Sequence, residues 1–81
     1  MTAQDFLILV NEWRQEQKSF REVLENGLVA LGIFPADLAR EHRLSDAAIS
    51  RWRSGKNDPH PLTKEIIVTY LEKRARRMVR R

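Results

Sequence analysis

The sequence predicts an all-α fold with five helices in a single domain. Apolar residues recur at intervals of three and four, as on one face of a helix, and nowhere do apolar and polar residues alternate over six or more positions. Residues typical of helix starts and stops separate these stretches. The chain has 81 residues, enough for one domain and too few for two, so a single domain over 1–81 is expected.

Two helical stretches occupy the N-terminal part. The first is expected over residues 3–17. Its apolar positions are Phe6, Leu9, Val10 and Trp13. The second begins at Ser19, because Ser19 and Glu22 have the spacing of a capping box, and it stops at Gly32. The pattern over 3–31 fits two helices or one bent helix equally.

Three further helices follow. The third is short, 35–41, and begins with proline, whose missing amide hydrogen is not needed at the first helical position. The fourth runs over 46–53, with Ser45 as N-cap and Gly55 as the stop. The fifth starts at Pro61 and continues towards the C-terminus. Its apolar positions are Leu62, Ile66, Ile67, Tyr70, Leu71 and Met78.

The charge distribution gives the first indication of a partner. The formal net charge is +4 and the sequence pI is about 10.1. Residues 1–32 carry three basic and five acidic groups, whereas residues 33–81 carry twelve basic and six acidic groups. This asymmetry favours a polyanionic partner, with nucleic acid first; the alternative is a solvated basic surface.

Several classes of protein are disfavoured by composition. The chain has no cysteine, and its two histidines, His42 and His60, lack ligand-like neighbours, so neither a metal site nor a cofactor is expected. No Gly-rich phosphate loop, Ser/His/Asp grouping or carboxylate pair is visible, so we expect no enzyme activity. The apolar run 6–10 is too short for a membrane span or signal peptide, and a cytoplasmic, nucleoid-associated protein is expected.

The most specific pattern lies in residues 38–56. Leu38 and Ala39 give the third helix its buried side, and Leu44 plugs the turn. Ile49 and Trp52, three positions apart, fix the fourth helix to the core. Two short helices joined by a tight turn, the second polar and basic on its outer side, are typical of a helix-turn-helix.

This stretch resembles the lambda-repressor-like (Cro/XRE-type) helix-turn-helix domains of phage and bacterial regulators. The similarity extends from about Phe20 to Leu71. Its best-matching pieces are Leu38-Ala39, Ser45 with Ile49 to Trp52, Ser54 to Lys56, and Pro59. The resemblance implies a five-helix domain whose fourth helix enters the major groove, commonly as a dimer on a palindromic operator. The helix-turn-helix core is then 19–71, residues 72–81 are a basic extension, and the first helix is partly an N-terminal addition.

Two residues depart from the family pattern. Arg43 stands in the turn where the family usually has Gly, and a left-handed backbone there costs Arg about 1 kcal/mol more than Gly. Phe34 stands where a capping Ser or Thr is usual. Residues 2–18 have no clear equivalent in the minimal domain, so their role is open.

The family pattern implies which residues would contact DNA. Base reading falls to Asp46, Ala47 and Arg51, with Ser50 as a weaker candidate: Arg51 could contact guanine, Asp46 the N4 of cytosine and Ala47 a thymine methyl group. The alternative for Asp46 is stabilisation of the helix dipole. The backbone anchors expected around that helix are Arg43, Ser45, Arg53, Ser54, Lys56 and Asn57. Capping by Ser45 and turn formation by Asn57 are their structural alternatives.

Three aromatic or basic features have competing interpretations. The spacing of Trp52 from Ile49 favours a core position over stacking on bases. Trp13 fits the core and a dimer contact. The C-terminal arginines fit a grip on DNA and a solvated tail equally.

The sequence therefore predicts a sequence-specific transcriptional regulator that binds double-stranded DNA as a homodimer, and a repressor is favoured over an activator. The first or the fifth helix could supply the dimer interface. An accessory recombination factor or an antitoxin-like autoregulator is one alternative. A protein-interaction module such as an antiactivator is another, and the apolar first helix is its best support.

Overall fold

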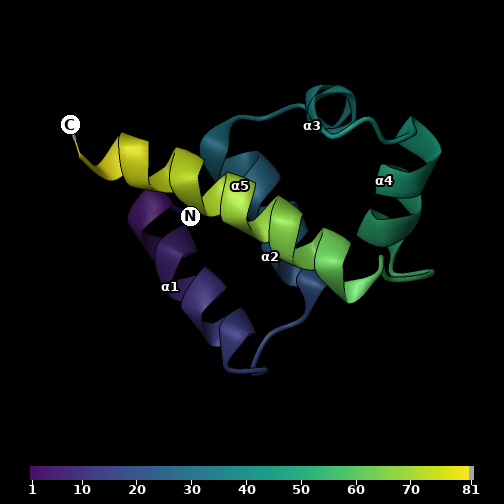
Figure 1. The fold of residues 1–81 in the computed structure, drawn as a ribbon. Helices are drawn as coiled ribbons and strands as arrows, with labels where there is room; N and C mark the ends of the chain where they lie inside the picture. Colours follow the sequence, from purple (N-terminus) through teal and green to yellow (C-terminus); the bar gives the residue numbers. More distant parts are fainter. Residues whose placement is uncertain (81) are drawn as a thin grey trace.

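The structure, a computed structural model, describes residues 1–80, and every regular element in that range is an α-helix (Figure 1). The helices are α1 (Ala3–Arg14), α2 (Phe20–Leu31), α3 (Pro35–Glu41), α4 (Asp46–Ser54) and α5 (Pro61–Val79). The predicted all-α fold with five helices is thus confirmed for the described residues. None of these helices is both long enough and apolar enough to traverse a membrane.

Residues 3–31 form two separate helices. Each begins with a capping box, in which Thr2 Oγ1 accepts from the Asp5 amide at 3.1 Å and Ser19 Oγ accepts from the Glu22 amide at 3.2 Å. The predicted end of α1 at residue 17 is wrong, because the helix stops at Arg14. Glu16 adopts a left-handed backbone with φ +61°, which turns the chain out of the helix.

Local signals set most of the other boundaries. Gly32 and Gly55 end α2 and α4 with φ +65° and +78°, a backbone region that side chains with a Cβ disfavour. Ser45 caps α4 by accepting from the Ala48 amide at 3.0 Å, and α4 extends one residue beyond the predicted end, to Ser54. Phe34 is the N-cap of α3 and makes no side-chain cap, because its ring has no hydrogen-bond acceptor such as the hydroxyl of Ser or Thr.

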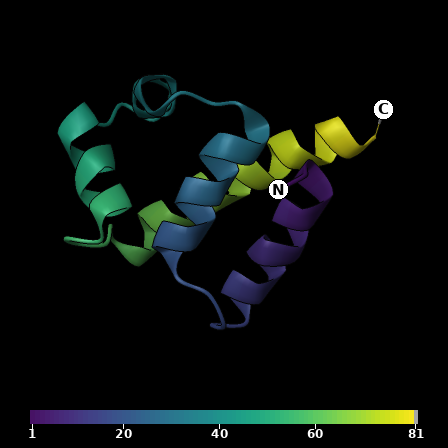
Figure 2. The ribbon, with the colours of Figure 1, turned by 180° about the vertical axis from the view of Figure 1, so that it is seen from behind.

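Helices α1, α2 and α5 pack together into a three-helix bundle that contains most of the core (Figures 1 and 2). Its fully buried side chains come from all three helices: Phe6, Val10, Val23, Leu24, Ile67, Val68 and Leu71. Gly27 permits their close approach. A Cβ there would lie 2.9 Å from the Phe6 ring and 3.1 Å from Leu71 Cδ1.

The apolar residues of α5 lie on two different faces. Ile67 and Leu71 are buried, together with Val68 and Ala75. Of the other predicted apolar positions, Tyr70 is partly buried and three are exposed: Leu62 by 66%, Ile66 by 55% and Met78 by 48%. Because α1 and α2 cover one side of α5 only, the apolar residues at its start form part of the molecular surface.

The pair α3–α4 lies at the end of the molecule opposite the C-terminus (Figures 1 and 2). It is joined to the bundle through contacts of α4 with α2. The predicted core residues of this pair are buried, namely Leu38, Ala39, Ile49 and Trp52, and Leu44 is partly buried. The Trp52 and Phe20 rings pack edge-on with their centroids 6.1 Å apart, so the predicted core position of Trp52 is confirmed.

Candidate nucleic-acid interface

A four-residue turn, 42–45, connects α3 to α4. Arg43 has φ +54°, so a non-glycine residue occupies the left-handed position of the turn. The chain is held there by the Leu44 amide, which donates to Ala39 O at 2.8 Å, and by the His42 amide, which donates to Leu38 O. In Figure 1 α3 is seen end-on and α4 from the side, so their axes are steeply inclined to each other.

The inner side of α4 is fixed to the protein. Ile49 is 1% and Trp52 is 7% exposed, and Trp52 packs on Phe20 of α2. Residues three apart lie on one side of a helix, so these two contacts determine which side of α4 faces outward.

The outer side of α4 is polar and open. The four predicted base-reading residues, Asp46, Ala47, Ser50 and Arg51, are all exposed. The side chains of Asp46, Ser50 and Arg51 make no hydrogen bond or ion pair with any other part of residues 1–80. The structure therefore brings these four residues to one accessible surface, which we call the α4 face.

The predicted anchors surround this face but differ in their freedom. Ser45 is occupied by its cap, and Ser54 Oγ donates to Arg51 O at 3.0 Å. Arg43, Lys56 and Asn57 are exposed, and their side chains have no polar partner in the described part of the chain. These three are therefore the anchors available to an incoming ligand.

Arg53, another predicted anchor, has a structural partner within the protein. Its guanidinium forms a bidentate ion pair with Glu25 of α2. Arg53 Nη2 donates to Glu25 Oε1 at 2.8 Å, and Arg53 Nε donates to Glu25 Oε2 at 3.0 Å. Arg21 Nε also donates to Arg53 O at 2.8 Å. Arg53 thus ties α4 to α2, and its predicted contact with the DNA backbone stays a prediction.

The ion pair shifts the titration of both partners. The hydrogen bond from Arg53 lowers the pKa of Glu25 below its ordinary value of 4.5, and the bond to Glu25 raises the pKa of Arg53. Glu25 and Arg21 were missed at the sequence level. The only available signal was their helical spacing on α2, because their partner lies 28 residues or more away along the chain.

The α4 face lies in a basic segment. Residues 43–57 carry four basic groups and one acidic group. Since Arg53 is paired internally, Arg43, Arg51 and Lys56 supply the accessible positive charge, and Asp46 is the opposing carboxylate. Such a surface can accept the phosphates of a nucleic acid while its polar side chains reach base edges.

An exposed aromatic ring lies beside the α4 face. Phe34 is 71% exposed and lines a shallow apolar hollow together with Ile49 and Ser50. Sequence reasoning identified Phe34 only as an unusual capping residue. Its position next to α4 makes it a neighbour of any ligand bound there.

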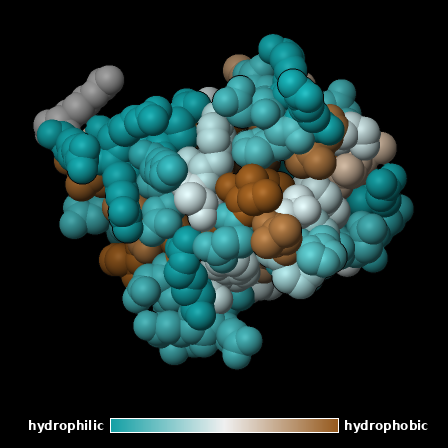
Figure 3. Space-filling model, in the orientation of Figure 1, coloured by the Kyte–Doolittle hydropathy of each residue, from teal (hydrophilic) through white to brown (hydrophobic). Residues whose placement is uncertain are grey.

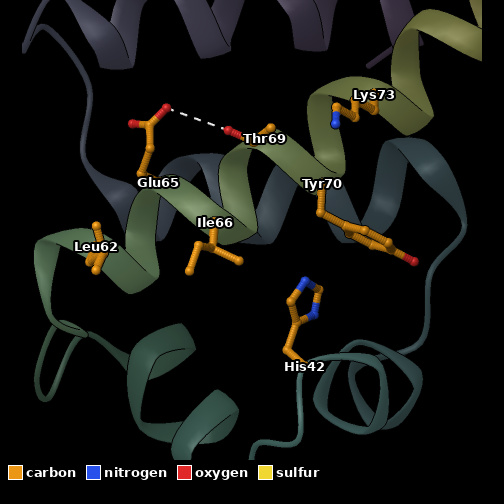
Figure 4. A pocket seen from close by; sticks show the side chains of 7 residues that line it. All are labelled: His42, Leu62, Glu65, Ile66, Thr69, Tyr70 and Lys73. Atoms are coloured by element: carbon orange, nitrogen blue, oxygen red, sulfur yellow. Dashed lines mark hydrogen bonds between the residues drawn. The ribbon is translucent and has the colours of Figure 1, made fainter.

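A second hollow opens on the outer side of α5. It is lined by His42, Leu62, Glu65, Ile66, Thr69, Tyr70 and Lys73 (Figure 4). Ile66 and Tyr70 point towards His42. The His42 and Tyr70 rings pack edge-on with their centroids 4.8 Å apart. Figure 3 shows hydrophobic residues gathered in the middle of this side of the molecule. Its lining is mainly apolar, so this hollow suits a protein contact better than a charged ligand.

Within residues 1–80, no three histidine, aspartate or glutamate side chains come together as ligands for a metal ion. Comparison of the chain with protein-family models, with curated proteins and with solved structures finds no match.

Proposed function

We propose that this chain is a sequence-specific DNA-binding protein in which α3 and α4 act as a helix-turn-helix and the α4 face enters the major groove. One observation carries the proposal: Ile49 and Trp52 fix one side of α4, while the opposite side presents polar groups without internal partners. Folding does not require those groups to be free, but base reading does.

Arg51 is the principal base-reading residue of the proposal. A guanidinium that is exposed and unpaired can donate two parallel hydrogen bonds to guanine O6 and N7. Arg53, two positions further, is already committed to Glu25. In this proposal Arg51 contacts DNA, whereas Arg53 holds α4 against α2.

Arg43, Lys56 and Asn57 flank the α4 face and would contact phosphates. Arg43 retains a left-handed backbone that glycine would adopt at lower cost, so a contact made by its side chain gives a reason for arginine there. Phosphate contacts of this kind set the position of the helix on DNA and contribute no sequence preference.

We further propose that the protein acts as a homodimer and as a transcriptional repressor on a palindromic operator. Helix α1 is the weaker interface candidate, because Phe6, Leu9 and Val10 are buried within the bundle. The apolar hollow with exposed Leu62 and Ile66 is the better one. The same burial reduces the apolar surface of α1 that supported an antiactivator, although Ile8 is exposed and Leu7 is only partly buried.

Selection of bound sequences from a random DNA pool, followed by affinity measurements on the selected duplex, tests the proposal. Arg51→Ala should weaken binding by about 1–3 kcal/mol and relax the preference at one base position. Arg51→Lys keeps the charge but loses the two-pronged contact, so it should relax the same position and leave the salt dependence unchanged.

Lys56→Ala is the matched comparison, since it should weaken binding to all sequences alike and reduce the salt slope by about 0.9. If Arg51→Ala bound selected and random duplexes as the unchanged protein does, the assignment of the α4 face would be wrong. Affinity that does not fall with rising salt would favour a protein-interaction module instead.

A further inference from the structure

The last two turns of α5 carry a second concentration of positive charge. Lys73, Arg76, Arg77 and Arg80 line one shallow hollow, and we call these four residues the basic end. Their spacing of three and four positions places them on one side of the helix. Leu71 and Ala75 on the opposite side are buried, so the basic end faces away from the bundle.

Internal pairing accounts for only part of this charge. Arg76 pairs with Glu72 at 3.0 Å, and Glu72 also forms an ion pair with Arg14 at 3.2 Å. Arg77 and Arg80 are exposed and have no ion pair with another residue of the described chain. The helix dipole favours cations in the last turn, but it does not require a cluster of like charges, which repel one another at this spacing.

The basic end and the α4 face lie at opposite ends of the molecule, whose longest extent is 33 Å (Figures 1 and 2). A straight duplex seated on the α4 face runs past the α3–α4 end of the protein. Because Arg77 and Arg80 lie at the other end of the molecule, phosphates contacted there would belong to another stretch of DNA.

We propose that the basic end is a separate, sequence-independent site for the DNA phosphate backbone, so that one protein molecule holds two duplex segments. From Lys73 to Arg80 a helix rises about 10 Å, which matches about three phosphates of one strand. The proposed function uses only the α4 face. The inference that one molecule joins two duplex segments rests on the DNA binding proposed for that face.

DNA is favoured over an anionic membrane surface by the packing of α5. A helix that lies on a membrane inserts an apolar side between the headgroups. In this part of α5 most of the apolar side, with Leu71 and Ala75, is already covered by the bundle, and Met78 and Val79 are its only exposed apolar residues. The phosphates of a duplex can be reached without exposing it.

The test is a bridging assay with the full chain. A random-sequence duplex is fixed to beads, the protein is added, and retention of a free fluorescent duplex is measured. Arg77→Gln/Arg80→Gln should weaken retention of the second duplex while binding to the selected operator persists. The salt slope for the second duplex should fall by about 1.8, as expected for two lost phosphate contacts.

Gln15→Glu/Gln17→Glu is the matched control, because it lowers the net charge by the same two units at exposed positions between α1 and α2. It should bridge as the unchanged protein does. Arg51→Ala should also still bridge random duplexes, which separates the basic end from the α4 face.

The proposal is overturned if Arg77→Gln/Arg80→Gln bridges undiminished, or if the basic end binds anionic lipid vesicles and not DNA. Bridging that survives these substitutions would point to two α4 faces of a dimer. If the double variant lost binding even of a single duplex, the basic end would be a phosphate site, and both the function proposed for the α4 face and the joining of two segments would fall.

Discussion

The three-helix bundle and the α3–α4 pair are built on different principles. In the bundle, long apolar side chains such as Phe6, Leu24 and Leu71 are fully buried and interlock around Gly27. The pair is smaller, and α4 is held to α2 by the contact of Trp52 with Phe20 and by the Arg53–Glu25 ion pair. Most of the fully buried side chains therefore lie away from the surface proposed to bind DNA.

Substitutions in the two regions should therefore have different effects. Changes in the bundle should alter stability and leave the DNA preference of the folded protein intact. Changes on the α4 face should do the reverse. Four substitutions test how far this division holds, beginning with the one expected to have the largest effect.

Phe6→Ala should destabilise the protein most. The side chain is fully buried, and removal of a buried phenylalanine side chain lowers the free energy of unfolding by about 3–5 kcal/mol. Urea unfolding followed by circular dichroism measures the loss. Ile8→Ala, on the exposed side of the same helix, should change stability by no more than about 0.5 kcal/mol. Equal losses in the two variants would contradict the packing described for α1.

Gly27→Ala should lower stability by about 1–2 kcal/mol. The new methyl group would lie 2.9 Å from the Phe6 ring, and such overpacking outweighs the gain in helix propensity of up to about 1 kcal/mol. In a Phe6→Leu background the same substitution should cost less, because the clashing ring is gone. A stabilising effect of Gly27→Ala in the unchanged protein would show that the helices can move apart at no cost.

Arg43→Gly should raise stability by about 0.5–1 kcal/mol and at the same time weaken DNA binding. Glycine removes the strain of φ +54°, whereas the proposed phosphate contact is lost. Glu16→Gly is the matched variant, since Glu16 has φ +61° and lies far from the α4 face. It should give a similar gain in stability without any change in DNA affinity. The two unfolding curves and a binding titration decide the matter.

Glu25→Gln should have the smallest effect, about 0.2–1 kcal/mol near neutral pH, because the ion pair is about 40% exposed. The pKa of Glu25 is lowered in the folded protein, so its contribution is present above its ordinary value of 4.5 and is lost as the pH falls below it. The stability difference between the two proteins should therefore vanish in acid. A constant difference across this pH range would mean that charge pairing is not its cause.

Local signals made much of the fold predictable. Capping residues such as Ser19 and Ser45 and the helix-ending glycines act on amides within a few positions, so the sequence alone carries their information. The inner side of α4 was equally predictable, because Ile49 and Trp52 repeat at helical spacing. The early end of α1 was not, since Glu16 is a residue that seldom adopts the left-handed backbone found there.

Contacts between distant parts of the chain limited the prediction of the site. The sequence cannot show that Glu25 lies opposite Arg53, 28 positions away, so the ion pair of this predicted anchor was not foreseen. For the same reason the apolar residues of α5 were not separated into buried Ile67 and exposed Ile66. Both features depend on which neighbour covers a side chain, which only tertiary packing decides.

The turn between α1 and α2 has a practical consequence. Residues 15–18 are all exposed, and the chain contains no cysteine. Gln17→Cys would therefore introduce a single reactive thiol through which the protein can be tethered to a sensor chip or labelled with one dye. Coupled in this way, the molecule would leave both of its cationic ends facing the solution.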